Sequence, residues 1–253
     1  MVYIAGLNIH DILARSPLSH QTGVEGIVWW TTVAGVVRTV RRHANGQFHH
    51  PHTRRALPTE AGKTGIPEPP NAEKNIGHKP PVPLLVKILS PVAHGFIILA
   101  PLAYIIGTGI DRLNQPEWFS NWALPDGEDY FGFGGFAAVR TISSVVNLAV
   151  YSLWKRAANE ARRVALNPDP TFPQEGPYSI IRHPVSAATL LSQVTYALMW
   201  WNTIPLMGLG VTAAYLAASL PYEEKLKEAD ILTGAEYARY KQRVPYKVIP
   251  YVW

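Results

Sequence analysis

Two groups of charged residues flank an uncharged stretch that runs from Val185 to Pro221. Arg182 and His183 belong to the segment GPYSIIRHP just before it, and Glu223 and Glu224 follow just after it. A carboxylate binds an ammonium group, and a guanidinium or a backbone N–H binds a carboxylate. If the uncharged stretch folds back on itself, these four residues form a site for a zwitterion at the mouth of an apolar cavity.

The uncharged stretch predicts a hairpin of two membrane-spanning helices. The sequence WWNTIP lies at its middle, and the halves Val185–Trp201 and Ile204–Leu220 each rise roughly 25 Å as helices, close to the thickness of a bilayer core. Two spans of equal length return their ends to the same face of the membrane. We therefore expect the Arg-His pair to lie near the two adjacent glutamates.

Further apolar runs predict the rest of a bundle. Ile88–Ile110 has no charged residue, Phe131–Trp154 has only Arg140, and Gly26–Val37 is a first span or an interfacial helix. Arg140 and Asn147 share a face that lines a polar cavity, unless a shifted register places Arg140 at the interface. Charged residues make up 16% of the chain, against about 25% in soluble domains. The fold class expected is an all-α, polytopic integral membrane helical bundle with about five transmembrane helices and a C-terminal cytosolic helix.

The distribution of charge predicts how the bundle is oriented. Basic residues gather in segments 38–87, 155–182 and 225–247, whereas acidic residues gather in 111–130. Because basic segments are retained on the cytosolic side, the C-terminus is expected in the cytosol. The net charge of +5 is interpreted as topology and attraction to lipid headgroups, so the bilayer is an expected partner and nucleic acid is not.

Three regions are expected along the chain. Residues 1–43 form an N-terminal segment with the candidate first span, 44–83 a Pro- and Gly-rich cytosolic loop, and 84–253 the membrane domain. The chain has no cysteine, which excludes disulfides, thiolate zinc sites and cysteine nucleophiles. No metal site is expected either, because the loop histidines lack an ordered scaffold and supporting carboxylates; these are His43, His49, His50 and His52.

An ordered set of residues in region 171–253 carries a family resemblance. It comprises Gly176-Pro177-Tyr178, Arg182-His183-Pro184, Glu223-Glu224, Leu226, Gly234, Glu236-Tyr237, Tyr240, Val244-Pro245 and Ile249-Pro250. With this spacing the chain resembles the isoprenylcysteine carboxyl methyltransferase-like membrane enzymes and, more loosely, the phospholipid methyltransferases. The resemblance implies an S-adenosyl-L-methionine-dependent methyltransferase of the endoplasmic reticulum membrane. It also implies that the cofactor enters from the cytosol and that a membrane lipid or a prenylated protein enters from the bilayer.

Transferred by position, the resemblance implies a cofactor site but no assigned catalytic base. Glu223, Glu224 or both should hold the amino group of the cofactor, and residues 171–173 should contact its adenosine. Arg182 is the candidate for its carboxylate. The residues expected to line the pocket are Tyr178, His183, Pro184, Val185 and Ser186.

Two departures from the family pattern keep alternatives open. Ser186 and Ala188 stand where the family usually has tyrosine and glycine, and the segment 217–222 lacks the arginine that usually precedes the acidic pair. The leading hypothesis is methylation of the carboxylate of an isoprenylated cysteine. The alternatives are a phospholipid or other lipid methyltransferase, a non-catalytic relative, and an NADPH-dependent sterol reductase-like protein, whose C-terminal segment resembles Val244–Pro250. In an alternative interpretation, neither pair binds a ligand. The Arg-His pair is then a basic membrane anchor, and the two glutamates are the first turn of a surface helix.

Overall fold

The computed structural model describes residues 3–4, 7–8, 20–44, 81–132, 134–165, 172–230 and 233–252. Two strands of two residues, β1 (Tyr3–Ile4) and β2 (Leu7–Asn8), pair antiparallel. The helices are α2 (His20–Ala44), α3 (Leu84–Ile110), α4 (Glu117–Ser120), α5 (Gly127–Phe131), α6 (Gly135–Ala165), the short 3-10 helix η3 (Gly176–Ser179), α7 (Pro184–Trp200), α8 (Thr203–Glu228) and α9 (Gly234–Arg243).

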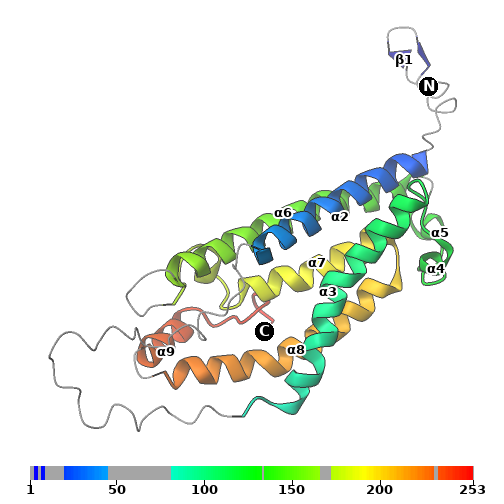
Figure 1. Cartoon of the computed structure of the whole chain (residues 1–253). Coiled ribbons are helices and arrows are strands. Elements are labelled where there is room, and N and C mark those ends of the chain that lie inside the picture. The colour runs from blue at the N-terminus through cyan, green and yellow to red at the C-terminus, as the bar shows by residue number, and fades with distance from the viewer. Residues whose placement is uncertain are drawn as a thin grey trace, which may run out of the picture.

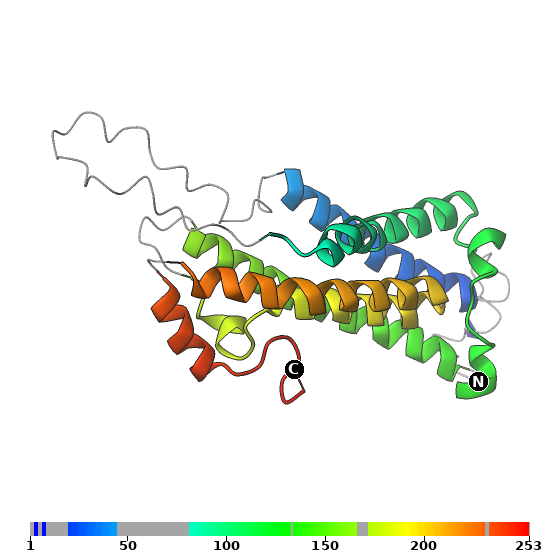
Figure 2. The same cartoon turned by 90° about the horizontal axis from the view of Figure 1, so that it is seen from below.

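The five long helices pack in a closed ring. Helix α7 lies between α6 and α8, α8 also packs against α3, and α2 packs against both α3 and α6. Figures 1 and 2 show these helices running along one another, with α9 at one end of the bundle and α4 and α5 at the other. These are called the α9 end and the α4–α5 end below.

Three of the described helices, α3, α6 and α8, are long and apolar enough to cross a membrane. Large apolar side chains such as Leu99 of α3 and Ile142 of α6 are exposed, as expected where lipid surrounds a helix. Helix α7 has 17 residues, and the apolar part of α2 is confined to Gly23–Val37. The helical fold and the membrane character agree with the prediction. About five spans were predicted, whereas three of the described helices are both long enough and apolar enough to cross a membrane.

Helices α7 and α8 form the predicted hairpin. Trp201 ends α7 in the left-handed conformation (φ 53°), and the Asn202 side chain accepts a hydrogen bond from the Ile204 N–H at the start of α8. Helix α8 continues through Pro221 to Glu228. The two glutamates therefore lie in the last turns of α8, and their interpretation as the first turn of a separate surface helix is wrong.

Helix α2 is longer than the apolar run predicted from the sequence, because it continues past Val37 to Ala44 and includes His43. Residues 45–80 of the predicted cytosolic loop, with His49, His50 and His52, lie outside the described residues. Predictions about the structure of that loop are therefore not tested by the fold.

Arg140 lies inside the bundle near the α4–α5 end. Its guanidinium forms an ion pair with Glu25 of α2, and its Nε donates to the Met199 carbonyl at 2.7 Å. The Tyr104 hydroxyl of α3 donates to the same glutamate. Arg140 therefore faces the inside of the bundle, as Asn147 does. Farther along α6, Asn147 is also buried and donates to the Thr195 hydroxyl of α7.

Candidate functional site

The Arg-His pair and the acidic pair meet at the α9 end of the bundle. The Arg182 Nε donates to Glu224 Oε1 at 2.8 Å, and both side chains are only 4% exposed. Pro184 occupies the first helical position of α7, where its missing N–H costs no hydrogen bond. The connecting segment therefore ends at His183, immediately before α7. The Arg182 side chain points towards α8, where it contacts Glu224.

The same arginine fastens the segment that follows α9. Its Nη1 donates to the carbonyls of Val244 and Pro245 at 3.0 and 3.1 Å. The backbone N–H groups of Arg182 and His183 donate to the carbonyls of Tyr246 and Lys247 at 2.9 and 2.8 Å. Glu224, Arg182 and residues 244–247 thus form one continuous hydrogen-bonded unit.

His183 is buried beside the same carboxylate and is neutral near pH 7. Burial lowers the pKa of its imidazole below the ordinary value of 6.5, although its hydrogen bond to Glu224 opposes this shift. The Nε2–H donates to Glu224 Oε1 at 3.2 Å, because a carboxylate can only accept. The neutral ring therefore carries its lone pair on Nδ1.

Glu223 and Glu224 are adjacent in sequence but differ in their surroundings. Successive residues of a helix point about 100° apart, so Glu224 turns inward to Arg182 and His183 while Glu223 is half-buried. Among the residues that the structure describes, Glu223 makes no hydrogen bond or ion pair. Its charge acts on Lys227, four residues farther along α8, and on Tyr178 and His183. Within the described part of the chain, Glu223 is therefore the carboxylate of the pair that makes no hydrogen bond or ion pair.

Tyr178 lies between this site and a neighbouring cavity. Gly176 begins η3 with a positive φ of 59°, which glycine adopts without a steric cost. The Tyr178 carbonyl accepts from the Tyr240 hydroxyl of α9 at 2.7 Å. Burial, followed by the charges of Glu160 and Glu223, raises the pKa of Tyr178 to about 12. Its phenol is therefore protonated near neutral pH and within electrostatic reach of both glutamates.

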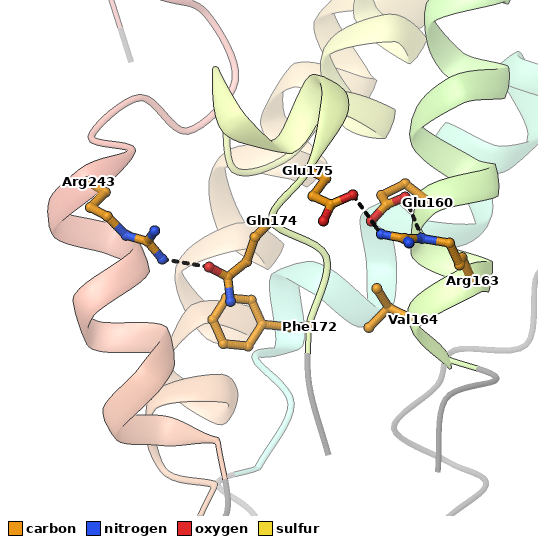
Figure 3. Close-up of a pocket in the computed structure, with 7 residues that line it drawn as sticks. All are labelled: Glu160, Arg163, Val164, Phe172, Gln174, Glu175 and Arg243. Atoms are coloured by element: carbon orange, nitrogen blue, oxygen red, sulfur yellow. Dashed lines mark hydrogen bonds and ion pairs between the residues drawn. The ribbon is translucent and has the colours of Figure 1, made fainter. Parts of the chain in front are cut away.

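The cavity has a volume of about 430 Å³ and opens between the end of α6, the segment before η3 and the end of α9. In Figure 3 a Glu175–Arg163–Glu160 network forms one side, and Gln174 with Arg243 forms the other. Phe172 packs with its ring against Tyr237 and Tyr240. The lining residues are Glu160, Arg163, Val164, Phe172, Gln174, Glu175 and Arg243. Such a lining suits a polar ligand that also carries an aromatic group.

The predicted site residues separate into two groups in the fold. Five residues gather around the end of the hairpin but do not line the cavity, namely Tyr178, Arg182, His183, Glu223 and Glu224. Pro184, Val185 and Ser186 form the first turn of α7 and do not line the cavity. Of residues 171–173, Phe172 lines it, while Thr171 lies outside the described residues. Arg182 differs most from expectation, because Glu224 and the backbone of residues 244–245 already occupy its donors.

Sequence reasoning missed most of the cavity wall. Its charged members come from three separate segments, Glu160 and Arg163 from α6, Glu175 before η3 and Arg243 at the end of α9. The available signals were the spacing of Glu160 and Arg163, which places them on one helix face, and the position of Glu175 just before Gly176. Within the described ranges no group of three or more His, Asp or Glu side chains is arranged to hold a metal ion.

No family model matches the sequence, and no curated protein is significantly similar to it.

Proposed function

We propose that this chain is an S-adenosyl-L-methionine-dependent membrane methyltransferase whose cofactor binds at the α9 end of the bundle. The observation that carries the proposal is that Glu223, a half-buried carboxylate with no hydrogen bond or ion pair among the described residues, lies within electrostatic reach of Tyr178, which also interacts with Glu160 of the polar cavity. The two carboxylates that line the cavity, Glu160 and Glu175, are both paired with Arg163, so Glu223 is the carboxylate near it that is available to an ammonium group. The volume of about 430 Å³ falls in the range typical of small-molecule sites.

Each part of such a cofactor has a candidate partner. Glu223 would bind the ammonium group, and Phe172 would offer an aromatic surface to the adenine. Arg243 lines the cavity and donates to the neutral Gln174 side chain, so its positive charge suits the carboxylate. Arg182 and Glu224 would support the site indirectly, because they hold the C-terminal segment against the hairpin.

The reaction requires little covalent chemistry from the protein. When bound, the cofactor would supply a methyl group already activated by the sulfonium, which the acceptor's electron pair would take up while the electrons of the broken carbon–sulfur bond return to sulfur. A carboxylate acceptor carries no proton to remove, so alignment in a water-poor pocket supplies most of the acceleration. An amine acceptor must first lose a proton, for which the Nδ1 lone pair of His183 is available.

The orientation proposed for the bundle follows its charges. The basic α9 end would face the cytosol, and the acidic α4–α5 end would face the opposite side of the membrane. Helices α2 and α7 would complete five spans around the ring, and α9 would lie on the cytosolic surface. The endoplasmic reticulum is the compartment that the family resemblance implies.

Two acceptors are proposed, in order. The first is the carboxylate of an isoprenylated cysteine, supported by the order and spacing of residues 176–250. The second is the headgroup of a phospholipid. It is favoured by one observation, that the turns of α8 before the acidic pair, Ala217–Tyr222, carry no cation to bind a substrate carboxylate.

Calorimetry on detergent-purified protein tests cofactor binding. We expect S-adenosylhomocysteine to bind, and Glu223→Gln to lose that binding. Glu228→Gln is the matched control, because Glu228 lies farther along α8, is exposed and is paired with Lys241. Unchanged binding in Glu223→Gln would contradict the assigned carboxylate. Binding of NADPH instead of S-adenosylhomocysteine would replace the methyltransferase with the reductase alternative.

Turnover assays then choose between acceptors. A farnesylated cysteine analogue and phosphatidylethanolamine are offered separately with radiolabelled cofactor. Methylation of the first supports the leading assignment, and methylation of the second supports the alternative. Cofactor binding without methylation of either would favour the non-catalytic relative.

A further inference from the structure

Large aromatic side chains are exposed at the α4–α5 end, away from the proposed cofactor site. They are Trp30 of α2, Trp118 of α4, Trp122 just after α4, and Tyr130 and Phe131 of α5, with exposed fractions of 66%, 49%, 51%, 67% and 45%. These five residues are called the aromatic collar. Single exposed aromatic residues are ordinary, whereas a group at one end of a bundle indicates a contact surface.

The collar is held rigidly on the hairpin turn. The Trp122 carbonyl accepts from the Thr203 N–H at 2.8 Å, and the Leu124 N–H donates to the Trp201 carbonyl at 3.0 Å. The Asn202 side chain donates to the carbonyl of Phe119, whose ring is buried in the core. Trp201 Nε1 donates to the Pro125 carbonyl at 2.7 Å. The exposed rings therefore stand on a fixed part of the fold.

Contacts to α3 show that members from different helices lie at a similar level. Trp29, next to Trp30, donates from its indole to the Ile105 carbonyl at 2.9 Å. Trp118 packs against Gly107, where an added Cβ would lie 3.0 Å from its ring. Both contacts fall in the last two turns of α3. Trp30 of α2 and Trp118 of α4 therefore lie at a similar level, beside the end of α3.

The distance from the collar to the α9 end matches a bilayer. Helix α8 rises roughly 30 Å between Asn202 and Pro221, which equals the usual thickness of the hydrocarbon core. Tryptophan and tyrosine concentrate where that core meets the headgroups. The acidic residues Asp126, Glu128 and Asp129 are exposed on the same part of the fold, and their charges require water.

We propose that the aromatic collar is a lipid-binding surface that lies in the phospholipid headgroup layer of the leaflet opposite the α9 end. The proposal rests on the membrane placement given above but not on the methyltransferase activity. Its ligand is the zwitterionic headgroup region of the bilayer, since the neighbouring acidic residues disfavour anionic headgroups.

Spin labelling tests this placement directly, because the chain has no cysteine and a single introduced cysteine is labelled alone. The full chain is reconstituted in phosphatidylcholine vesicles with one nitroxide in each of the variants W122C and Y130C. The references are V145C, at an exposed position well inside α6, and D129C, at an exposed acidic position. Relaxation by oxygen, which dissolves in the bilayer, is compared with relaxation by a water-soluble nickel chelate.

We expect the collar labels to fall between the two references, with Val145 deepest and Asp129 in water. Labels at Trp122 and Tyr130 that behave like Asp129 would overturn the proposal, since the collar would then stand clear of the membrane. Labels as deep as Val145 would overturn it equally. Tyr130 provides the second position in case W122C disturbs the hairpin turn. Cofactor binding, measured on the same samples, reports separately on the proposed activity.

Discussion

Two buried Glu–Arg pairs lie at opposite ends of the bundle, and they differ in what surrounds them. Near the α4–α5 end, Glu25 and Arg140 connect α2 to α6, and Tyr104 and Gln115 donate to the same carboxylate. At the α9 end, Glu224 and Arg182 connect α8 to the segment that precedes α7 and to the segment that follows α9. Both pairs satisfy the requirement that a buried charge be matched and hydrogen-bonded.

The two pairs differ in whether a charged group without a hydrogen bond or ion pair lies beside them. The Glu25 pair is enclosed by packed rings, where Trp200 stacks on Tyr104 and Phe119 packs beside them. The Glu224 pair has Glu223 next to it and a polar cavity nearby. A buried ion pair alone is therefore weak evidence for a binding site. The neighbouring Glu223, which makes no hydrogen bond or ion pair among the described residues, is the more informative feature.

The largest loss of stability is expected at the enclosed pair. Arg140→Met leaves the Glu25 charge buried without its partner, which costs about 3–5 kcal/mol. The double variant Arg140→Met with Glu25→Gln should recover much of this loss. Unfolding in mixed detergent micelles measures both. Equal stability of the single and double variants would show that the pair is not coupled.

A slightly smaller loss is expected at the α9 end, about 3 kcal/mol for Glu224→Ala. This change leaves the Arg182 guanidinium with only the backbone carbonyls of residues 244–245 as acceptors. Hydrogen exchange should therefore quicken at the amides of Arg182 and His183, which donate to Tyr246 and Lys247. Unchanged protection at these two amides would mean that the C-terminal segment is held by other contacts.

Glu223→Gln separates binding from stability. Because Glu223 makes no ion pair among the described residues, the free energy of unfolding should change by no more than about 0.5 kcal/mol. Binding of S-adenosylhomocysteine should weaken at least about tenfold, or by about 1.4 kcal/mol. Unfolding and calorimetry are measured on the same preparation. A loss of stability as large as that of Glu224→Ala would remove the distinction between the two glutamates.

The smallest effect is a pH dependence at the α9 end. Burial lowers the pKa of His183 below 6.5, so the unfolded chain takes up a proton before the folded chain does. The contribution of His183 to stability is therefore fully present above about pH 6.5 and is lost as the pH falls from there towards its lower folded pKa. His183→Gln keeps a donor for Glu224 but removes the titration. Unfolding measured between pH 7 and pH 5 should show a shallower slope in this variant.

The convergence of the two charged pairs could be predicted because it follows from length alone. Two spans of equal rise must bring Arg182 and Glu224 to the same side. The division of roles between Glu223 and Glu224 could not be predicted, since it depends on the rotation of α8, and α8 continues through Pro221. Glu25 was also missed, because its partner Arg140 is 115 residues away and nothing local marks the pair.

The order in which the chain is synthesised affects the two ends differently. The Glu25–Arg140 pair and its hydrogen-bond partners Tyr104, Gln115 and Met199 all precede the hairpin turn, so they can come together while the ribosome is still adding residues. The carbonyls that accept from Arg182 belong to residues 244 and 245, which are made only after every long helix. Until those residues have emerged, the arginine lacks two of its acceptors, and the proposed cofactor site is the last part of the bundle to mature.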